Sequence, residues 1–265
     1  VHIMRGIPRK AVQLNLPVYG TTYRARDIAD TTSICTWNPQ NYGIDMNKPG
    51  AQEYYNSLIQ KLADWGVDFL KVDDMVPYPK EVVAIKEAIE KAGRSMVYSL
   101  SPGGNTNLKD MPYYTSAQMV RITPDIWDDK ESIDRSFKAW RRWQGMGRTG
   151  FWPDLDMVPF GKLQLMNPDT STFKQKNTQL SGKGTARVSK LNKQEMRTFI
   201  TQRALAASPI MVGGDLLTLD DYSTALLTNK NMLGCNQNGK TGILINEEDS
   251  LETWGTSVTG VQIKG

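Results

Sequence analysis

The stretch VDFLKVDDMVPYP, residues 67–79, brings a lysine and two carboxylates to the end of an apolar segment. The apolar residues within 67–72 are typical of a buried β-strand, which we expect to end at Asp73 and Asp74, before a proline-rich turn. Lys71 and Asp73 are two positions apart, so their side chains point to the same side of the strand. A lysine beside a carboxylate keeps that carboxylate ionised. The stretch therefore predicts a strand end whose side chains are suited to catalysis.

Strands and helices alternate on both sides of this stretch. Strands are expected to start at Val1, Val67, Ser95, Gln118, Gly150 and Pro209. Helices are expected over residues 51–66, 79–93, 128–143, 193–208 and 218–229. Residues 9–48 and 161–191 are polar without a helical or strand period, and they are interpreted as loops. The alternation is typical of βαβ units and predicts an α/β protein with a parallel sheet.

The acidic residues indicate which α/β architecture is present. They follow several different strands, at Asp73, Asp74, Asp125, Asp154, Asp156 and Asp215. In a (β/α)₈ barrel the carboxyl ends of all strands converge on one face, where active sites are built. The sequence lacks the motifs of nucleotide-binding folds, because neither GxGxxG after the first strand nor GxxxxGK[ST] occurs. A barrel that has lost some of its units is therefore the favoured fold.

Composition excludes several other classes of function. The chain has 265 residues, of which 39% are hydrophobic and 23% charged, as in globular domains. The net charge of +4 and the lack of a basic helix give no support to nucleic-acid or anionic-membrane binding. The apolar runs are too short to cross a membrane. Two cysteines, Cys35 and Cys235, argue against a zinc site or a disulfide framework and leave open one bridge.

Carboxylates are the side chains that remain for catalysis. His2 is the only histidine and lies at the edge of the chain, which disfavours Ser-His-Asp, Cys-His and zinc chemistry. Two reactions use carboxylates on a barrel rim: glycoside hydrolysis by a carboxylate pair and metal-assisted proton abstraction. Arg121 precedes Asp125 by four residues and places a cation beside that carboxylate. Helix capping is the simpler interpretation of Asp128 and Asp129.

Five motifs occur in an order that resembles a known family. They are FLKVDDM, VYSLSPGG, VRITPDIWDD, WPDLDMVPFG and ALAASPIMVGGDL. They resemble successive strand ends of the melibiase-type α-galactosidases and α-N-acetylgalactosaminidases of glycoside hydrolase family 27. These are retaining enzymes with a (β/α)₈ barrel and a C-terminal β-sandwich. The resemblance implies a barrel lacking its first two strands over residues 1–240, the start of a C-terminal β-domain over 241–265, and a longer parent polypeptide.

The resemblance also implies roles for individual residues. The family's nucleophile, the aspartate of a Lys-x-Asp strand end, falls on Asp73. Its general acid/base, four residues after an arginine, falls on Asp125. The positions that hold or face the sugar match Lys71, Ser101, Arg121, Asp156, Met157, His2 and Asp74. His2 stands where the family often has a tyrosine, and Trp37 is as well explained by core packing as by a sugar platform.

The activity implied is that of a retaining exo-α-glycosidase, foremost an α-galactosidase acting on an oligosaccharide, polysaccharide or glycoconjugate. The resemblance implies no metal and no organic cofactor, and it favours a secreted or periplasmic enzyme. The alternatives on the same scaffold are an α-N-acetylgalactosaminidase and a β-L-arabinopyranosidase. The loop Ser101 to Gly104 leaves room for an acetamido group, although it matches neither galactosidases nor N-acetylgalactosaminidases closely, and the family's WNDPDM is WPDLDM here.

Two alternatives come from other classes of protein. A Mg²⁺-dependent barrel lyase would use four carboxylates, those of Asp73, Asp74, Asp154 and Asp156. A non-catalytic sugar-binding relative would need neither Asp73 nor Asp125, so the presence of both argues against it.

Overall fold

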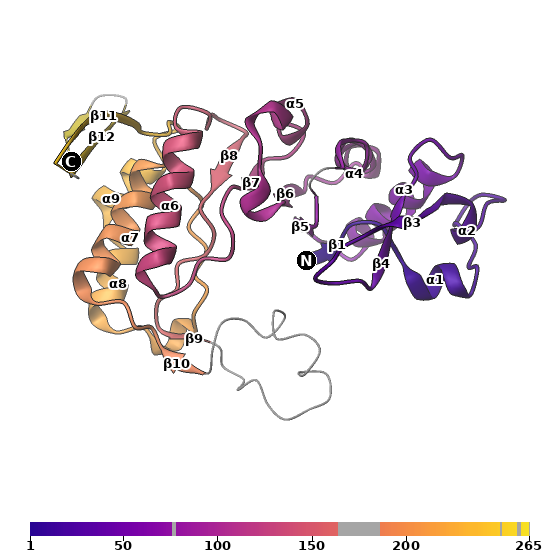
Figure 1. The fold of residues 1–265 in the computed structure, drawn as a ribbon, viewed down its shortest axis with the longest axis horizontal. Helices are drawn as coiled ribbons and strands as arrows, with labels where there is room; N and C mark the ends of the chain where they lie inside the picture. The colour runs from indigo at the N-terminus through magenta and orange to yellow at the C-terminus, as the bar shows by residue number, and fades with distance from the viewer. Residues whose placement is uncertain (76–77, 164–185, 250, 259–260, 265) are drawn as a thin grey trace. The chain divides into compact units, whose positions relative to one another are not determined.

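The computed structural model describes residues 1–75, 78–163, 186–249, 251–258 and 261–264. The chain forms two compact units, residues 1–120 and 121–265. In Figure 1 the first unit runs from indigo to magenta and the second from magenta to yellow.

A parallel sheet is the centre of the first unit. Its strands are, in spatial order, β1 (His2–Met4), β5 (Phe69–Asp73), β6 (Val97–Ser101) and β7 (Met119–Arg121). The register sets Met4 opposite Asp73, and Asp73 opposite Ser101. The carboxyl ends of β1, β5 and β6 therefore meet at one edge of the sheet, as the strand-end pattern predicts.

Two long helices connect these strands, and both confirm the periodicity of the sequence. Helix α3 (Ala51–Asp64) buries Tyr55, Ile59 and Leu62, which recur at helical spacing. Helix α4 (Pro79–Ala92) begins with a proline, whose fixed φ suits the first turn. It ends at Gly93, which has a φ of 67° that favours glycine.

The expectation of a loop over residues 9–48 is wrong. These residues and their neighbours form α1 (Arg9–Gln13), α2 (Ala25–Ile28) and an antiparallel sheet of β2 (Ile7–Pro8), β4 (Asn41–Ile44) and β3 (Ala29–Ile34). Each element is too short for a hydrophobic period to show in the sequence. They are held by single buried side chains such as Val12, Ile28 and Ile44.

The second unit packs helices around α7 (Lys193–Leu205). Its other helices are α6 (Lys130–Trp143), α8 (Asp221–Leu227) and α9 (Lys230–Asn236). Helix α7 contacts α6, α8 and α9 (Figure 1). A capping box begins α7, because Asn192 accepts from the Glu195 backbone and Glu195 accepts from the Asn192 backbone. Asp129 caps α6 by accepting from the Ser132 amide at 2.8 Å. Helix α9 was not expected from the sequence.

Strand β8 (Trp152–Asp154) pairs through its backbone with the residue that follows β7. Its Asp154 carbonyl accepts from the Ile122 amide at 2.9 Å. The strand expected from Pro209 is only a single parallel bridge between Val212 and Val158. Pro209 has no amide donor, and a β-carbon at Gly214 would lie 1.7 Å from the Phe160 carbonyl oxygen. The segment therefore packs closely without forming a regular strand.

Short antiparallel strands complete the second unit. Strands β9 (Lys162–Leu163) and β10 (Arg187–Val188) pair within the segment that was expected to be loop, and residues 164–185 of that segment lie outside the described residues. The alternating tail forms β11 (Ile243–Glu248), β12 (Leu251–Val258) and β13 (Val261–Lys264), as predicted. Trp254 of β12 stacks on Trp140 with ring centroids 3.5 Å apart. No helix in the described ranges is long and apolar enough to cross a membrane.

Candidate active site

Asp73 ends strand β5 among the residues that the sequence predicts around it. His2 Nε2 lies 2.9 Å from Asp73 Oδ2, and Ser101 is its register partner on β6. Burial raises the pKa of Asp73, but His2, the Ser101 hydroxyl and the charge of Lys71 together hold that pKa below its ordinary value. The structure thus brings three predicted site residues, His2, Ser101 and Lys71, together around the Asp73 carboxylate.

Asp74, the next residue, is turned towards the protein. Its φ is 59°, in the left-handed region that aspartate enters only at a cost. Its Oδ2 accepts from Arg5 Nε at 3.0 Å. Burial raises the pKa of Asp74 above its ordinary value, although the Arg5 charge and the Cys35 thiol oppose this rise. The described contacts of the Asp74 side chain are therefore those of an orienting residue, and its predicted contact with sugar stays a prediction.

A second group of predicted residues gathers in the second unit around Arg121. Its Nη1 lies 3.0 Å from Asp125 Oδ1 and 3.9 Å from Asp156 Oδ1. Asp156 Oδ2 also accepts from the Ile126 amide at 2.8 Å, on the segment that follows Asp125. The side chain of Asp125 is 64% exposed, whereas that of Asp156 is 14% exposed. One guanidinium therefore fixes an accessible carboxylate beside a largely buried one.

Asp154 lies beneath this group and has an unusual proton affinity. Burial, followed by the negative charge of Asp156, raises the pKa of Asp154 to about 6. Arg203 of α7 is fully buried nearby, and its Nη2 donates to the Leu155 carbonyl at 2.8 Å and to the Met157 carbonyl at 3.5 Å. Burial lowers the pKa of Arg203 to about 9, against the pull of the two aspartates. Arg203 thus holds the backbone on which Asp154, Asp156 and Met157 lie.

Sequence reasoning missed both buried arginines, Arg5 and Arg203. Each has a weak signal in the sequence: Arg5 directly follows an apolar strand, and Arg203 interrupts an apolar helix end. Long cationic side chains are almost never fully buried unless they are paired. Without the fold, the sequence therefore does not predict that either arginine is buried.

The remaining predicted residues have structural contacts. Asp128 does not cap α6 as expected; it pairs with Arg187 and accepts from the Lys190 amide at 2.9 Å. It is Asp129 that reaches the helix start. Asp215 accepts from the Leu217 amide at 3.0 Å, which is a capping contact. Trp37 is 36% exposed. Cys35 and Cys235 are both buried, free thiols, so the disulfide left open by the sequence is not formed.

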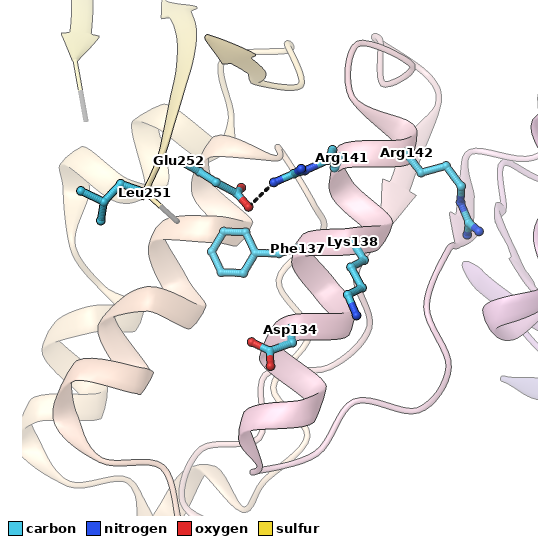
Figure 2. A pocket seen from close by; sticks show the side chains of 7 residues that line it. All are labelled: Asp134, Phe137, Lys138, Arg141, Arg142, Leu251 and Glu252. Carbon is cyan, nitrogen blue, oxygen red and sulfur yellow. Dashed lines mark hydrogen bonds and ion pairs between the residues drawn. The ribbon is translucent and has the colours of Figure 1, made fainter. Parts of the chain in front are cut away.

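A surface hollow in the second unit lies between α6 and β12 (Figure 2). It is lined by Asp134, Phe137, Lys138, Arg141, Arg142, Leu251 and Glu252. Figure 2 shows Arg141 reaching across to Glu252, with which it forms an ion pair. The lining contains none of the predicted site residues. Among the described residues, no three His, Cys, Asp or Glu side chains gather in a group that could hold a metal ion.

The family model described as Alpha galactosidase A matches residues 40–181, just over half of the chain. The chain belongs to this family. Among curated members, α-galactosidase 2 of Arabidopsis thaliana is 26% identical over 78% of this chain and 47% of its own length. Human α-galactosidase A is 26% identical over 80% of this chain and 47% of its own length. The chain therefore spans about half the length of these curated relatives.

A solved structure in glycoside hydrolase family 27 is more similar. The β-L-arabinopyranosidase of Geobacillus stearothermophilus is 40% identical, with a TM-score of 0.89 over 98% of this chain and 59% of that protein. This likeness confirms the α/β barrel class for the part that the chain covers. The resemblance to family 27, drawn from five strand-end motifs, is confirmed as well.

Proposed function

We propose that the protein carrying this chain is a retaining exo-α-glycosidase that releases terminal α-galactose. The observation that carries the proposal is the Asp73 carboxylate, ionised at the end of β5 by His2, Ser101 and Lys71, in a chain of the α-galactosidase A family. The Arg121–Asp125 pair supplies the second carboxyl group that retaining glycosidases require. Curated relatives named α-galactosidases support the same substrate.

In the first step the Asp73 carboxylate attacks the anomeric carbon of the sugar. A carbon–oxygen bond forms to Asp73 while the glycosidic bond breaks, and protonated Asp125 gives its proton to the departing oxygen. The aglycone leaves as an alcohol, and the sugar stays as an ester of Asp73. Lys71 and His2 flank the nucleophile, where they can also bind sugar hydroxyls.

In the second step a water molecule attacks the same anomeric carbon and the ester bond to Asp73 breaks. Asp125, now a carboxylate, takes a proton from that water, so both groups return to their starting forms. Neither step needs a metal or an organic cofactor. The mechanism requires the two carboxyl groups to face each other about 5–5.5 Å apart in the complete protein, and about 6.5–9.5 Å would indicate inversion.

A β-L-arabinopyranoside is the second candidate substrate. The observation that favours it is the 40% identity to the Geobacillus enzyme, against 26% to the Arabidopsis and human relatives. The two sugars share the ring configuration that the nucleophile meets and differ at carbon 5, where galactose carries a hydroxymethyl group. A pocket difference of this size is worth about 1–3 kcal/mol of discrimination. The small residues from Ser101 to Gly104 keep an α-N-acetylgalactosaminide as a further alternative.

The test is hydrolysis by the full-length protein of nitrophenyl α-galactoside, β-L-arabinopyranoside and α-N-acetylgalactosaminide. We expect at least one to be cleaved, and the ratios of kcat/KM to identify the sugar. Proton NMR of the first-formed product should show the anomeric configuration of the substrate. Activity on none of them above an Asp73→Ala control, or a product of inverted configuration, would refute the proposal.

A further inference from the structure

We propose that Arg5 is a positioning residue for the nucleophile, acting through a buried group that we call the Arg5 cluster: Arg5, Asp74 and Glu81. The inference rests on the proposed function, because it takes Asp73 as the nucleophile. Arg5 follows β1 directly and is 2% exposed, although its side chain is a guanidinium group. A buried cation of this kind persists only where its hydrogen bonds are satisfied.

The three guanidinium nitrogens of Arg5 each have a different acceptor. Nε donates to Asp74 Oδ2 at 3.0 Å, and Nη1 donates to Glu81 Oε1 at 2.9 Å. Nη2 donates to Ser33 Oγ at 3.0 Å. The acceptors come from the end of β5, from α4 and from β3, so the planar fork links three elements in one fixed geometry.

The main chain of Arg5 holds the nucleophile's own backbone. The Arg5 amide donates to the Asp73 carbonyl at 3.2 Å, while the Asn41 side chain donates to the Arg5 carbonyl at 2.8 Å. Arg5 therefore contacts both members of the aspartate pair, Asp73 through the backbone and Asp74 through the side chain.

Glu81 anchors the cluster to the core. It is 3% exposed, and its second carboxylate oxygen accepts a hydrogen bond from the Tyr55 hydroxyl. That hydroxyl in turn accepts from the Gly6 amide at 3.0 Å, on the residue next to Arg5. The guanidinium also lies over the Tyr78 ring, 3.2 Å from its centroid. The Arg5 guanidinium is thus held by hydrogen bonds along its edge and by the Tyr78 ring on its face.

The cluster explains why the chain keeps Asp74 at a φ of 59° beside the nucleophile. The bond from Arg5 offsets the cost of that conformation, which sets the direction of the Asp73 backbone. Without the bond, Asp74 is free to relax, and Asp73 loses its alignment with His2 and Ser101. A displacement of about 1 Å at a reacting group can cost on the order of 10²-fold in rate.

The first experiment measures kcat and KM for Arg5→Met and Arg5→Lys in the full-length protein, on the nitrophenyl glycoside that it cleaves best. We expect kcat to fall about 10²-fold in Arg5→Met with KM within about threefold, because alignment and not sugar binding is lost. Arg5→Lys should recover less than a tenth of the wild-type kcat, since one ammonium cannot replace the three-way fork.

Arg94→Met is the matched control. Arg94 holds the opposite end of the same strand, through the carbonyls of Gly66 and Val67 and the carboxylate of Asp68. We expect its kcat to stay within about twofold of wild type. A folded Arg5→Met protein whose kcat does not differ from that of Arg94→Met would overturn the inference.

A second pair of variants decides the matter if Arg5→Met does not fold. Asp74→Asn keeps an oxygen acceptor for Arg5, and Asp74→Gly removes it, while both residues tolerate a positive φ. We expect kcat of Asp74→Gly to be at least tenfold below that of Asp74→Asn at similar KM. Equal kcat values would overturn the inference. Asp73→Ala distinguishes a failure of the proposed function from a failure of the inference. If Asp73→Ala retains activity, the proposed function fails, and the inference fails with it. If instead the Arg5 and Asp74 variants keep the wild-type kcat, only the inference fails.

Discussion

The molecule contains two strand-end aspartate pairs, each beside a buried arginine, and Asp73 of one pair differs in its pKa from Asp154 of the other. At Asp73 the pKa is held below its ordinary value, whereas at Asp154 it rises to about 6. Burial acts in the same direction on both, so it cannot explain the difference. Asp73 is surrounded by His2, Ser101 and Lys71, which all favour its charged form.

At Asp154 the nearest charge is the like charge of Asp156, and the neighbouring arginine is engaged elsewhere. Arg203 donates to Gln202 and to backbone carbonyls and acts on the aspartates only through space. Arg5, by contrast, donates directly to Asp74 and Glu81. At Asp73 the hydrogen-bonding and cationic neighbours outweigh burial, whereas at Asp154 burial and the charge of Asp156 outweigh the hydrogen bond from the Asp156 amide and the charges of Arg121 and Arg203.

The largest expected effect is on the Asp73 side of this comparison. Asp73→Ala in the full-length protein should lower kcat by at least roughly 10⁴-fold on every substrate, because no covalent intermediate can form. Asp154→Asn should leave a far larger share of activity, since Asp154 is not the nucleophile. Steady-state kinetics on nitrophenyl and natural glycosides measure both losses. Similar losses of kcat for Asp73→Ala and Asp154→Asn would contradict the distinction between the two aspartate pairs.

Asp125, the accessible carboxylate beside Arg121, should show a loss that depends on the leaving group. Asp125→Ala should slow alkyl glycosides by about 10²–10⁴-fold through loss of proton donation. Nitrophenyl glycosides should lose least in the first step, because nitrophenolate needs no proton. Comparing kcat/KM across leaving groups of graded acidity measures this. A uniform loss across the series would remove Asp125 from the acid role.

Arg203 should matter for stability, since its removal takes away the buried cation that acts on Asp154 and Asp156 and leaves them with Arg121. Arg203→Met should lower the free energy of unfolding by about 3–5 kcal/mol at neutral pH, as expected for breaking a buried charge cluster. Adding Asp154→Asn should return part of that loss. Urea unfolding measures the change, and Arg197→Met, an exposed arginine of the same helix, is the control. An Arg203→Met protein as stable as this control would contradict the assignment.

The smallest expected effect is a pH dependence at Asp154. Its folded-state pKa of about 6 lies above its ordinary value of 3.8, so the native state binds the proton more tightly than the unfolded state. Ionisation therefore costs stability as pH rises from about 4 to about 6, by on the order of 2–3 kcal/mol. The stability of Asp154→Asn relative to wild type should grow across this window and level off above it. A difference that is constant from pH 4 to 7 would show that Asp154 titrates normally.

The sequence predicts the first pair better than the second because of how each is built. Asp73, Lys71 and the flanking helices α3 and α4 follow from period and register, which depend on residues close in the chain. The side-chain partners of Arg5, and the Leu155 carbonyl that Arg203 contacts, lie many residues away. The local sequence therefore does not show that these two side chains are buried. The short elements within residues 9–48 were not predicted for a related reason, because strands and helices of a few residues show no hydrophobic period.

Substrate choice lies beyond the reach of the motifs for another physical reason. Galactose, N-acetylgalactosamine and arabinopyranose present the same ring geometry to Asp73 and differ only in one substituent. The small residues from Ser101 to Gly104 do not identify the sugar substituent that this segment would face. The family was therefore readable from five strand ends, while the sugar has to be determined by kinetics.

The most direct test of the account is to trap the covalent intermediate. The full-length protein is incubated with the 5-fluoroglycosyl fluoride of its best substrate, digested with trypsin and analysed by mass spectrometry. The account predicts one sugar on the peptide of residues 72–80, with fragment ions placing it on Asp73 and not on Asp74. A label on any other residue, or turnover of the probe by an inverting route without any adduct, would contradict it.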